Sequence, residues 1–323
     1  MRTAAIAWER FWFAPQPTAT LALVRIAVGA LSLAWALSLA PDLFSLYSAG
    51  GIVPAQPGAQ RPGVWGLLGI VPGDAALVTV YAALLGGSIA LLVGLWTRLA
   101  AGVVFVALLS FARRNPFVLN DGDALLRMLA LFVALAPAGA SLSLDRLRRA
   151  GDRFWEFPAR APWALRLIQI QLSVVYLSTV WQKARGSYWT DGTAVSYALR
   201  LEDLQRFPVP APVSDSLTLA NVATFGTLAT ELALAVLVWS RRARPWVLGL
   251  GVALHLSIEY SLRVGFFSFA MLACYVAFIS PEAAKAAILA GRDRLGRRRP
   301  PDFLRSGGPR STVRPRSDAS PTS

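Results

Sequence analysis

Apolar residues in this chain form long blocks that are almost free of charge, with no alternating pattern. The first block runs from about residue 18 to residue 39. Seven more follow at roughly residues 75–96, 99–112, 124–139, 164–182, 218–239, 246–262 and 265–282. A helix needs about 20 apolar residues to cross a bilayer. The pattern therefore predicts an all-α, polytopic integral membrane protein with about eight transmembrane helices. It leaves open whether the short blocks at 99–112 and 124–139 both span fully.

Both ends of the chain differ from this apolar middle. Residues 1–17 are predicted to form an amphipathic helix on the bilayer surface, because three aromatic side chains share one helical face: Trp8, Phe11 and Trp12. Residues 284–323 are rich in Arg, Pro, Ser and Gly, a composition typical of a basic, disordered tail. Residues 18–283 between them are the predicted transmembrane domain.

The basic residues favour one side of the membrane. If the N-terminus is cytoplasmic, the cytoplasmic segments hold 22 of the 32 lysines and arginines, the outer segments hold nine, and Arg25 lies within the first helix. This asymmetry follows the positive-inside rule. An even number of spans then places both termini in the cytoplasm of a cell inner (plasma) membrane. The net charge of +14 lies mainly in loops and the tail, where it suits lipid headgroups, so no nucleic-acid partner is expected.

Few charged or titratable groups lie within the apolar blocks, and each costs about 2.5–3.5 kcal/mol on insertion scales. The candidates among them are Arg25, Glu231, His255 and Glu259, together with Lys183 at the end of the fifth block. A second polar group stands at the predicted outer mouth of the fourth block: Asn120, Asp121 and Asp123. Structural ion pairing is the alternative interpretation for Arg25, for Glu231 and for this outer group.

Lys183 is one of two lysines in a chain that otherwise uses arginine. A desolvated lysine can lose its proton and act as a general base, whereas arginine stays protonated in practice. The alternative is a lysine whose ammonium extends to the headgroups.

His255 is the sole histidine, with Glu259 one turn later on the same helical face. The alternative to a functional role is a hydrogen-bonded core residue. Cys274 is the sole cysteine, so the sequence lacks the ligands of a zinc site and no metal is expected.

The residues around Lys183 and His255 resemble a known family. Residues 169–199 read QIQLSVVYLSTVWQKARGSYWTDGTAVSYAL, in which Tyr176 precedes Lys183 and Trp189 follows it; His255 precedes the string GFFSF at residues 265–269. Together these strings resemble the membrane region of vitamin K-dependent γ-glutamyl carboxylase and its bacterial relatives, the horizontally transferred transmembrane domain (HTTM) family. The resemblance covers about residues 8–283.

In the carboxylase, a lysine deprotonates a reduced quinone, which then reacts with oxygen. The resemblance therefore implies that Lys183 is the base and that His255 supports the reaction, in a pocket open to the outer side. The pocket residues that it adds are Arg25, Asn120, Asp121, Asp123, Tyr176 and Trp189. Glu231 and Glu259 are further candidates for this pocket, because they are charged residues inside apolar blocks. A quinol-dependent, carboxylase-like enzyme is the leading hypothesis. A non-catalytic factor for maturation, export or immunity of a secreted peptide stays open, and a transporter is a third alternative.

Overall fold

The computed structural model describes residues 2–53, 66–71, 73–118 and 120–297. The chain divides into two units, Met1–Lys285 and Ala286–Ser323, and the first contains almost all the described elements. Residues 284–297 belong to a helix that begins before the predicted tail, because alanines in that stretch favour helix. The rest of the predicted tail, 298–323, lies outside the described residues.

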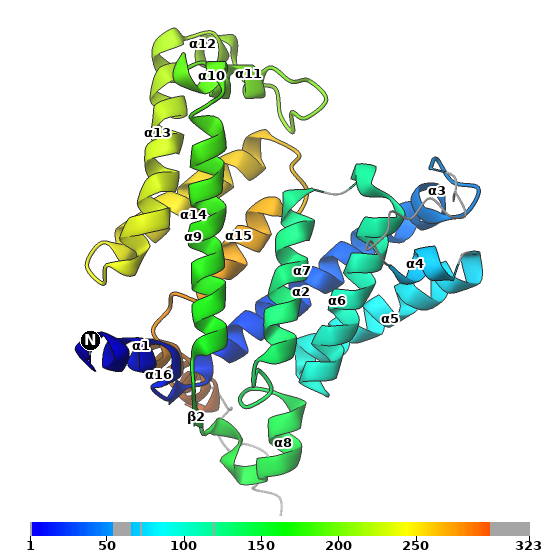
Figure 1. Ribbon diagram of the computed structural model, residues 1–323, viewed down its shortest axis with the longest axis vertical. Helices are drawn as coiled ribbons and strands as arrows, with labels where there is room; N and C mark the ends of the chain where they lie inside the picture. Colours follow the sequence, from blue (N-terminus) through cyan, green and yellow to red (C-terminus); the bar gives the residue numbers. More distant parts are fainter. Residues whose placement is uncertain (1, 54–65, 72, 119, 298–323) are drawn as a thin grey trace, which may run out of the picture. The chain divides into compact units, whose positions relative to one another are not determined.

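Helices account for nearly all of the described secondary structure (Figure 1). The long helices of the first unit are α2 (Ala19–Leu39), α5 (Asp74–Val93), α6 (Thr97–Arg114), α7 (Asp121–Leu135), α9 (Trp163–Lys183), α13 (Leu217–Val236), α14 (Arg244–Ser261) and α15 (Phe267–Val276). The other helices are α1 (Arg2–Phe13), α3 (Leu43–Tyr47), α4 (Leu67–Ile70), α8 (Leu144–Ala150), α10 (Ser187–Thr190), α11 (Ala194–Leu199), α12 (Ala211–Ser214) and α16 (Pro281–Arg297). Each of the eight predicted apolar blocks therefore contains one long helix.

Four of these helices are long and apolar enough to cross a membrane. They are α2 with its extension to Tyr47, α5, α9, and α13 with its extension to Trp239. Counting α15 and the following helix as one broken span gives five. The helices of the two short blocks are not among these candidate spans. Helix α6 carries three arginines, and α7 has 15 residues. The structure thus shows a helical protein with four or five helices suited to a bilayer.

The long helices pack in two groups that meet at α15. In the first group α2 packs on α5, α5 on α6 and α6 on α7; in the second α9 packs on α13, α13 on α14 and α14 on α15. Helix α15 also contacts α7 and α2. Close approach of α2 and α5 depends on Gly29, where a Cβ would lie 2.6 Å from the backbone nitrogen of Leu92. This arrangement brings α9, α13, α14 and α15 together around one polar interior.

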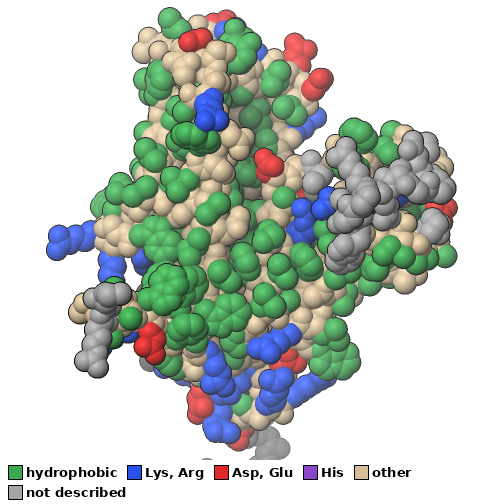
Figure 2. All heavy atoms as spheres, in the orientation of Figure 1, with side chains coloured by type: hydrophobic (Ala, Val, Ile, Leu, Met, Phe, Trp, Pro, Cys, Tyr) green, Lys and Arg blue, Asp and Glu red, His purple; other side chains and the backbone are tan. Residues whose placement is uncertain are grey.

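Segments predicted to lie on the same side of the membrane are joined by direct contacts. On the predicted cytoplasmic side, strand β1 (Gln16–Pro17) pairs antiparallel with β2 (Ala159–Arg160). Asp145 there accepts hydrogen bonds from the backbone of Trp96 and Thr97 at 2.9 Å each. Figure 2 shows basic side chains gathered at this end, around α8.

On the predicted outer side, Gln205 forms a β-bridge with Leu262, so the loop before α12 meets the end of α14. Helices α10, α11 and α12 lie at this end of α9 and α13, opposite α1, β2 and α8 (Figure 1).

Candidate functional site

Lys183 and Glu231 form an ion pair across the contact between α9 and α13. The Lys183 Nζ lies 2.5 Å from the Glu231 Oε1, and the side chains are 23% and 8% exposed. Lys183 is the last residue of α9, where the helix dipole favours a positive charge. Its ammonium also lies 4.5 Å from the centroid of the Trp189 ring, close enough for a cation–π contact. The lysine is therefore held by a carboxylate and an aromatic ring.

His255 lies in a buried chain of hydroxyl and imidazole groups. Its Nε2 shares a hydrogen bond of 2.9 Å with the Tyr176 hydroxyl, which is also hydrogen-bonded to the hydroxyl of Tyr275. All three side chains are buried, and they come from α14, α9 and α15. Gly251, one turn before His255, makes room for this chain, because a Cβ there would lie 2.3 Å from the Tyr275 hydroxyl oxygen.

The ion pair and the tyrosine–histidine chain lie in the same group of packed helices. Lys183 and Tyr176 are both on α9, and Glu231, His255 and Tyr275 are on α13, α14 and α15. With Trp189, these residues are called the Lys183 cluster below. Its members are Lys183, Trp189, Glu231, Tyr176, His255 and Tyr275. The structure thus brings five of the predicted site residues together and adds Tyr275.

Two buried polar atoms of the Lys183 cluster have no hydrogen-bond partner among the described residues. They are the Glu231 Oε2 and the His255 Nδ1. Leaving a buried polar atom unpaired costs about 1–3 kcal/mol, so such atoms are uncommon in folded proteins. Both atoms are therefore available to a bound molecule or to a proton in transit.

The Asn120–Asp123 pair caps the start of α7. The Asn120 side chain accepts a hydrogen bond of 3.1 Å from the Asp123 backbone, and the Asp123 carboxylate accepts one of 3.2 Å from the Asn120 backbone. Asp123 also accepts a bond of 2.7 Å from the Trp35 indole. Asp121 is exposed in the first turn of the helix. These contacts satisfy the free amide groups at a helix start.

This cap adjoins the Lys183 cluster through Phe267. At Gly122 a Cβ would lie 2.5 Å from the Phe267 backbone nitrogen, and at Gly265 (φ +64°) one would lie 2.7 Å from the Asn120 amide nitrogen. The Phe267 ring lies edge-on to the His255 ring, with 5.7 Å between centroids. The two glycines therefore allow the start of α7 to pack against the segment that carries Phe267, whose ring contacts His255.

Arg25 lies apart from the Lys183 cluster, at the contact of α2 with the end of α5. Its guanidinium is buried and donates to the carbonyls of Leu91 at 3.2 Å and Leu142 at 2.6 Å. Gly94, in the left-handed region at φ +72°, leaves the space it fills. Arg25 thus satisfies carbonyls that a helix end leaves free.

Glu259 also lies apart, near the predicted outer surface. Its carboxylate pairs with Arg206 of the loop between α11 and α12, and its second oxygen is buried without a partner among the described residues. The spacing of His255 and Glu259 on α14 does place them on neighbouring turns, but their side chains have different partners.

Tyr275 is the cluster member that the sequence analysis missed. It lies in an uncharged block, LACYVAF at residues 272–278, so no charged residue draws attention to it. The feature that could have indicated Tyr275 is its hydroxyl in the middle of an apolar helix, because a buried tyrosine hydroxyl usually has a hydrogen-bond partner. No group of three or more histidine, cysteine or acidic residues that suits a metal occurs among residues 2–53, 66–71, 73–118 and 120–297.

The fold and the cluster together define a helical membrane protein with a buried polar site. The model of the HTTM domain matches residues 13–282, and the chain therefore belongs to the HTTM domain family. This confirms the family resemblance and relates the chain to the membrane domain of the carboxylase. No curated protein and no solved structure matches the chain.

Proposed function

We propose that this protein is a membrane enzyme that uses Lys183 as a general base on the hydroxyl of a reduced quinone. The observation that carries the proposal is the Lys183–Glu231 ion pair, at 2.5 Å, whose lysine is on the same helix as Tyr176, which is hydrogen-bonded to the buried His255. A snorkelling lysine would extend its ammonium to water, whereas this side chain is 23% exposed and bound to a buried carboxylate.

The ion pair gives Lys183 a route to the neutral amine. A proton passes from the Nζ to Glu231, which leaves an uncharged amine beside an uncharged carboxylic acid and removes two charges from a poorly solvated place. The amine lone pair then accepts a proton from a substrate hydroxyl, which regenerates the ammonium. Glu231 holds the exchanged proton at either oxygen, and its Oε2 has no competing partner among the described residues.

The tyrosine–histidine chain would orient the substrate and stabilise negative charge near Lys183. The Nδ1 of His255 has no hydrogen-bond partner in the described part of the chain, while its Nε2 is fixed by Tyr176. Fixing one ring nitrogen sets the direction in which the other one points. A hydrogen bond from or to Nδ1 is therefore the contact that we assign to a bound molecule.

These residues fit a quinol. Trp189 and Phe267 offer aromatic faces, and the Glu231 Oε2 and His255 Nδ1 offer polar contacts for a ring hydroxyl. When bound, a quinol would supply an acidic hydroxyl and two reducing electrons.

The proposal includes eight membrane spans with both termini in the cytoplasm of an inner (plasma) membrane. Its support is that the predicted cytoplasmic segments meet one another at β1–β2 and at Asp145, while the predicted outer segments meet at the Gln205–Leu262 bridge. Lys183 then lies towards the outer face, as the family resemblance implies. Cysteine-scanning accessibility on both faces of inverted and right-side-out vesicles tests this orientation.

A comparison of Lys183→Arg with the wild type tests the catalytic role. Arginine keeps the positive charge and the pairing with Glu231 but does not release a proton, so we expect quinone binding to persist and oxygen uptake with a reduced quinone analogue to vanish. Lys285→Arg changes the other lysine, which is exposed, and serves as the control. Full turnover in Lys183→Arg would contradict a base role for Lys183.

A second candidate is a non-catalytic factor for a secreted peptide. It is favoured by large apolar side chains that are exposed around α10–α12: Tyr188, Tyr197, Leu201, Leu204 and Phe207. Such a surface suits a partner as well as lipid. A stoichiometric peptide that co-purifies with the protein, without any quinone, would favour this candidate over the enzyme.

A further inference from the structure

A cavity of about 760 Å³ lies at the start of α9, at the other end of this helix from Lys183. Its wall includes Phe11 of α1, residues at the start of α9, the turn between α13 and α14, and the chain after α15. These are segments from the predicted cytoplasmic side. The cavity is therefore at the level where the interfacial helix would meet lipid headgroups.

Three arginines line this cavity: Arg166, Arg241 and Arg244. The Arg244 charge acts unfavourably on Arg166, and the Arg241 charge acts unfavourably on Arg244. None of the three forms an ion pair within the described residues. Glu282 is the one carboxylate in the wall, so the cavity carries an excess of positive charge.

Two of the arginines are fixed by hydrogen bonds. Arg166 donates to the Phe11 carbonyl at 3.2 Å and to the buried Gln169 side chain at 2.8 Å, and it lies 4.8 Å from the Phe11 ring centroid. Arg244 donates to the Val238 carbonyl at 2.9 Å. Like charges held this close without a counter-ion form a site that an anion would stabilise.

Aromatic side chains form the apolar part of the same cavity. The Trp239 ring lies 6.0 Å from the Phe11 ring and 5.7 Å from the Phe278 ring, centroid to centroid. Trp239 also donates to Ser173 at 2.9 Å, which fixes its orientation. An anionic group next to an aromatic, apolar wall at the bilayer surface matches the junction of a phosphoryl headgroup and its glycerol backbone.

We infer that this cavity binds a phosphoryl group, through Arg166, Arg241 and Arg244. The guanidinium fork is suited to phosphate oxygens. A phosphoryl group would balance the positive charge of the three arginines, which the described residues leave without a counter-ion. The phosphoryl group belongs either to an anionic phospholipid or to a soluble phosphate. The inference is independent of any reaction at Lys183, because the two sites lie at opposite ends of α9.

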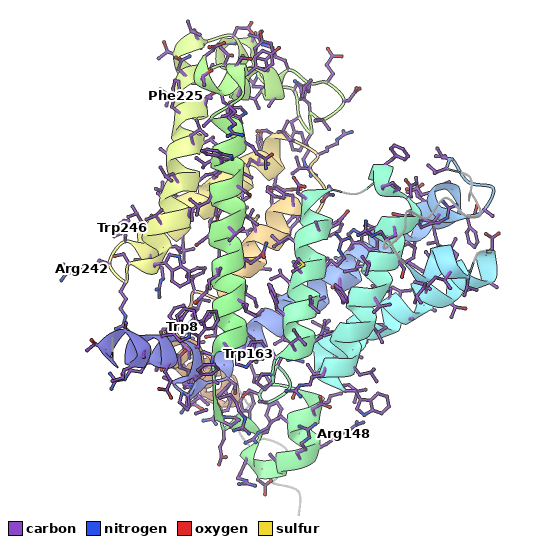
Figure 3. All side chains as sticks on the ribbon, in the orientation of Figure 1. Trp8, Arg148, Trp163, Phe225, Arg242 and Trp246 are labelled. Carbon is purple, nitrogen blue, oxygen red and sulfur yellow. The ribbon has the colours of Figure 1, made fainter. Side chains whose placement is uncertain are left out.

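The chain offers a matched pair of variants for the test. Arg241 and Arg242 are both exposed, but Arg241 lines the cavity, whereas Arg242 does not line it and extends outward from the turn before α14 (Figure 3). Arg241→Gln and Arg242→Gln remove the same charge from adjacent positions. Both side chains are exposed, and neither forms an ion pair within the described part of the chain, so both variants should yield folded protein.

The full-length protein in neutral detergent is titrated with dihexanoyl phosphatidylglycerol, with inorganic phosphate and with dihexanoylglycerol, which has no phosphate. We expect saturable binding of the phosphatidylglycerol to the wild type and to Arg242→Gln, and about fivefold weaker binding to Arg241→Gln. Inorganic phosphate that binds with the same dependence on Arg241, while the lipid does not, would assign the site to a soluble phosphate. Equal effects of the two variants for both phosphorylated probes, or binding of dihexanoylglycerol as tight as that of the lipid, would overturn the inference.

Discussion

The Lys183 ammonium and the Glu231 carboxylate lie 2.5 Å apart, between the last residue of α9 and the middle of α13. The two residues are 48 positions apart in the sequence, and each places a charge in an apolar block. A buried ion pair of this kind is weak evidence for stability, because the cost of desolvating both charges offsets their attraction. We therefore attribute this pair to the chemistry proposed above and not to stability.

Removing one member of this pair should destabilise the protein. Glu231→Gln leaves the Lys183 charge unpaired, and we expect a loss of about 2 kcal/mol. This is less than for a fully buried pair, because 23% of the lysine side chain is exposed. Thermal unfolding in detergent measures it, with Glu156→Gln as a control, since Glu156 belongs to a pair in which it is largely exposed.

The double variant Lys183→Met/Glu231→Leu extends this measurement. Apolar side chains of similar size remove both charges, and we expect stability to return to within about 1 kcal/mol of the wild type, while quinone-dependent activity stays absent. A double variant as unstable as Glu231→Gln would mean that the pair itself holds α9 and α13 together.

Gly251 should be sensitive to a single added methyl group. The Cβ of Gly251→Ala would lie 2.3 Å from the Tyr275 hydroxyl oxygen, so we expect a loss of about 1–3 kcal/mol. Gly249→Ala is the matched control, because no atom lies within 4 Å of the added Cβ. There the gain in helix propensity should leave stability unchanged or raise it by up to about 1 kcal/mol.

The added Cβ would lie closest to the Tyr275 hydroxyl oxygen, at 2.3 Å, and next to the Tyr275 Cζ, at 2.8 Å, and a second substitution measures the share of the oxygen. Tyr275→Phe removes the hydroxyl, so Gly251→Ala/Tyr275→Phe should recover part of the stability lost by Gly251→Ala alone. If Gly251→Ala were as stable as Gly249→Ala, the packing of Tyr275 against α14 would differ from the one described.

Arg25 should matter for folding and little for ligand binding. Its guanidinium donates to backbone carbonyls at the end of α5 and at Leu142, so Arg25→Gln should cost at least about 2 kcal/mol. Arg25→Lys should not restore stability, because an ammonium lacks the planar fork. The quinone content per folded molecule should be unchanged in both variants. A well-folded Arg25→Gln protein without quinone would instead place Arg25 in the pocket.

Asp145 should make stability depend on pH in the acidic range. Burial opposes its ionisation, but hydrogen bonds from Thr97 and Trp96 and the charge of Arg149 outweigh burial, so the pKa lies below the ordinary value of 3.8. A lowered pKa in the folded state adds stability above the unfolded-state pKa, and this stability is lost as the pH falls through the folded-state pKa.

Comparison of the wild type with Asp145→Asn between pH 3 and 7 measures this contribution. The difference in unfolding temperature should be constant above about pH 5 and should shrink towards pH 3. A difference that is independent of pH would show that the Asp145 carboxylate is not held in its ionised form by these bonds.

The helices could be predicted from the sequence because a long apolar block has few stable folds other than a helix in a bilayer. Each predicted block contains a helix, but several end early. Helix α15 is confined between Gly265, at φ +64°, and Pro281, so it covers only ten residues of its block. Such local breaks depend on backbone conformation, which hydropathy does not report.

The site could be predicted where its residues share one segment. Tyr176, Lys183 and Trp189 lie within 14 residues, and their common helix and turn follow from the sequence. Ion-pair partners on other helices could not be assigned. A charged residue in an apolar block indicates that a partner is needed, but the sequence does not show which residue this partner is. Glu231 pairs with Lys183, whereas Glu259 pairs with Arg206, and only the packing of α13 and α14 separates these outcomes.

The most direct test of the central claim is the quinone content of protein purified from native membranes. The wild type, Lys183→Arg, Lys183→Ala and Lys285→Ala are extracted with organic solvent after equal purification. We expect a co-purifying quinone in the wild type, in Lys285→Ala and in Lys183→Arg, and its loss from folded Lys183→Ala. Extracts without quinone from all four proteins, or equal quinone in all four, would contradict a quinol site at Lys183.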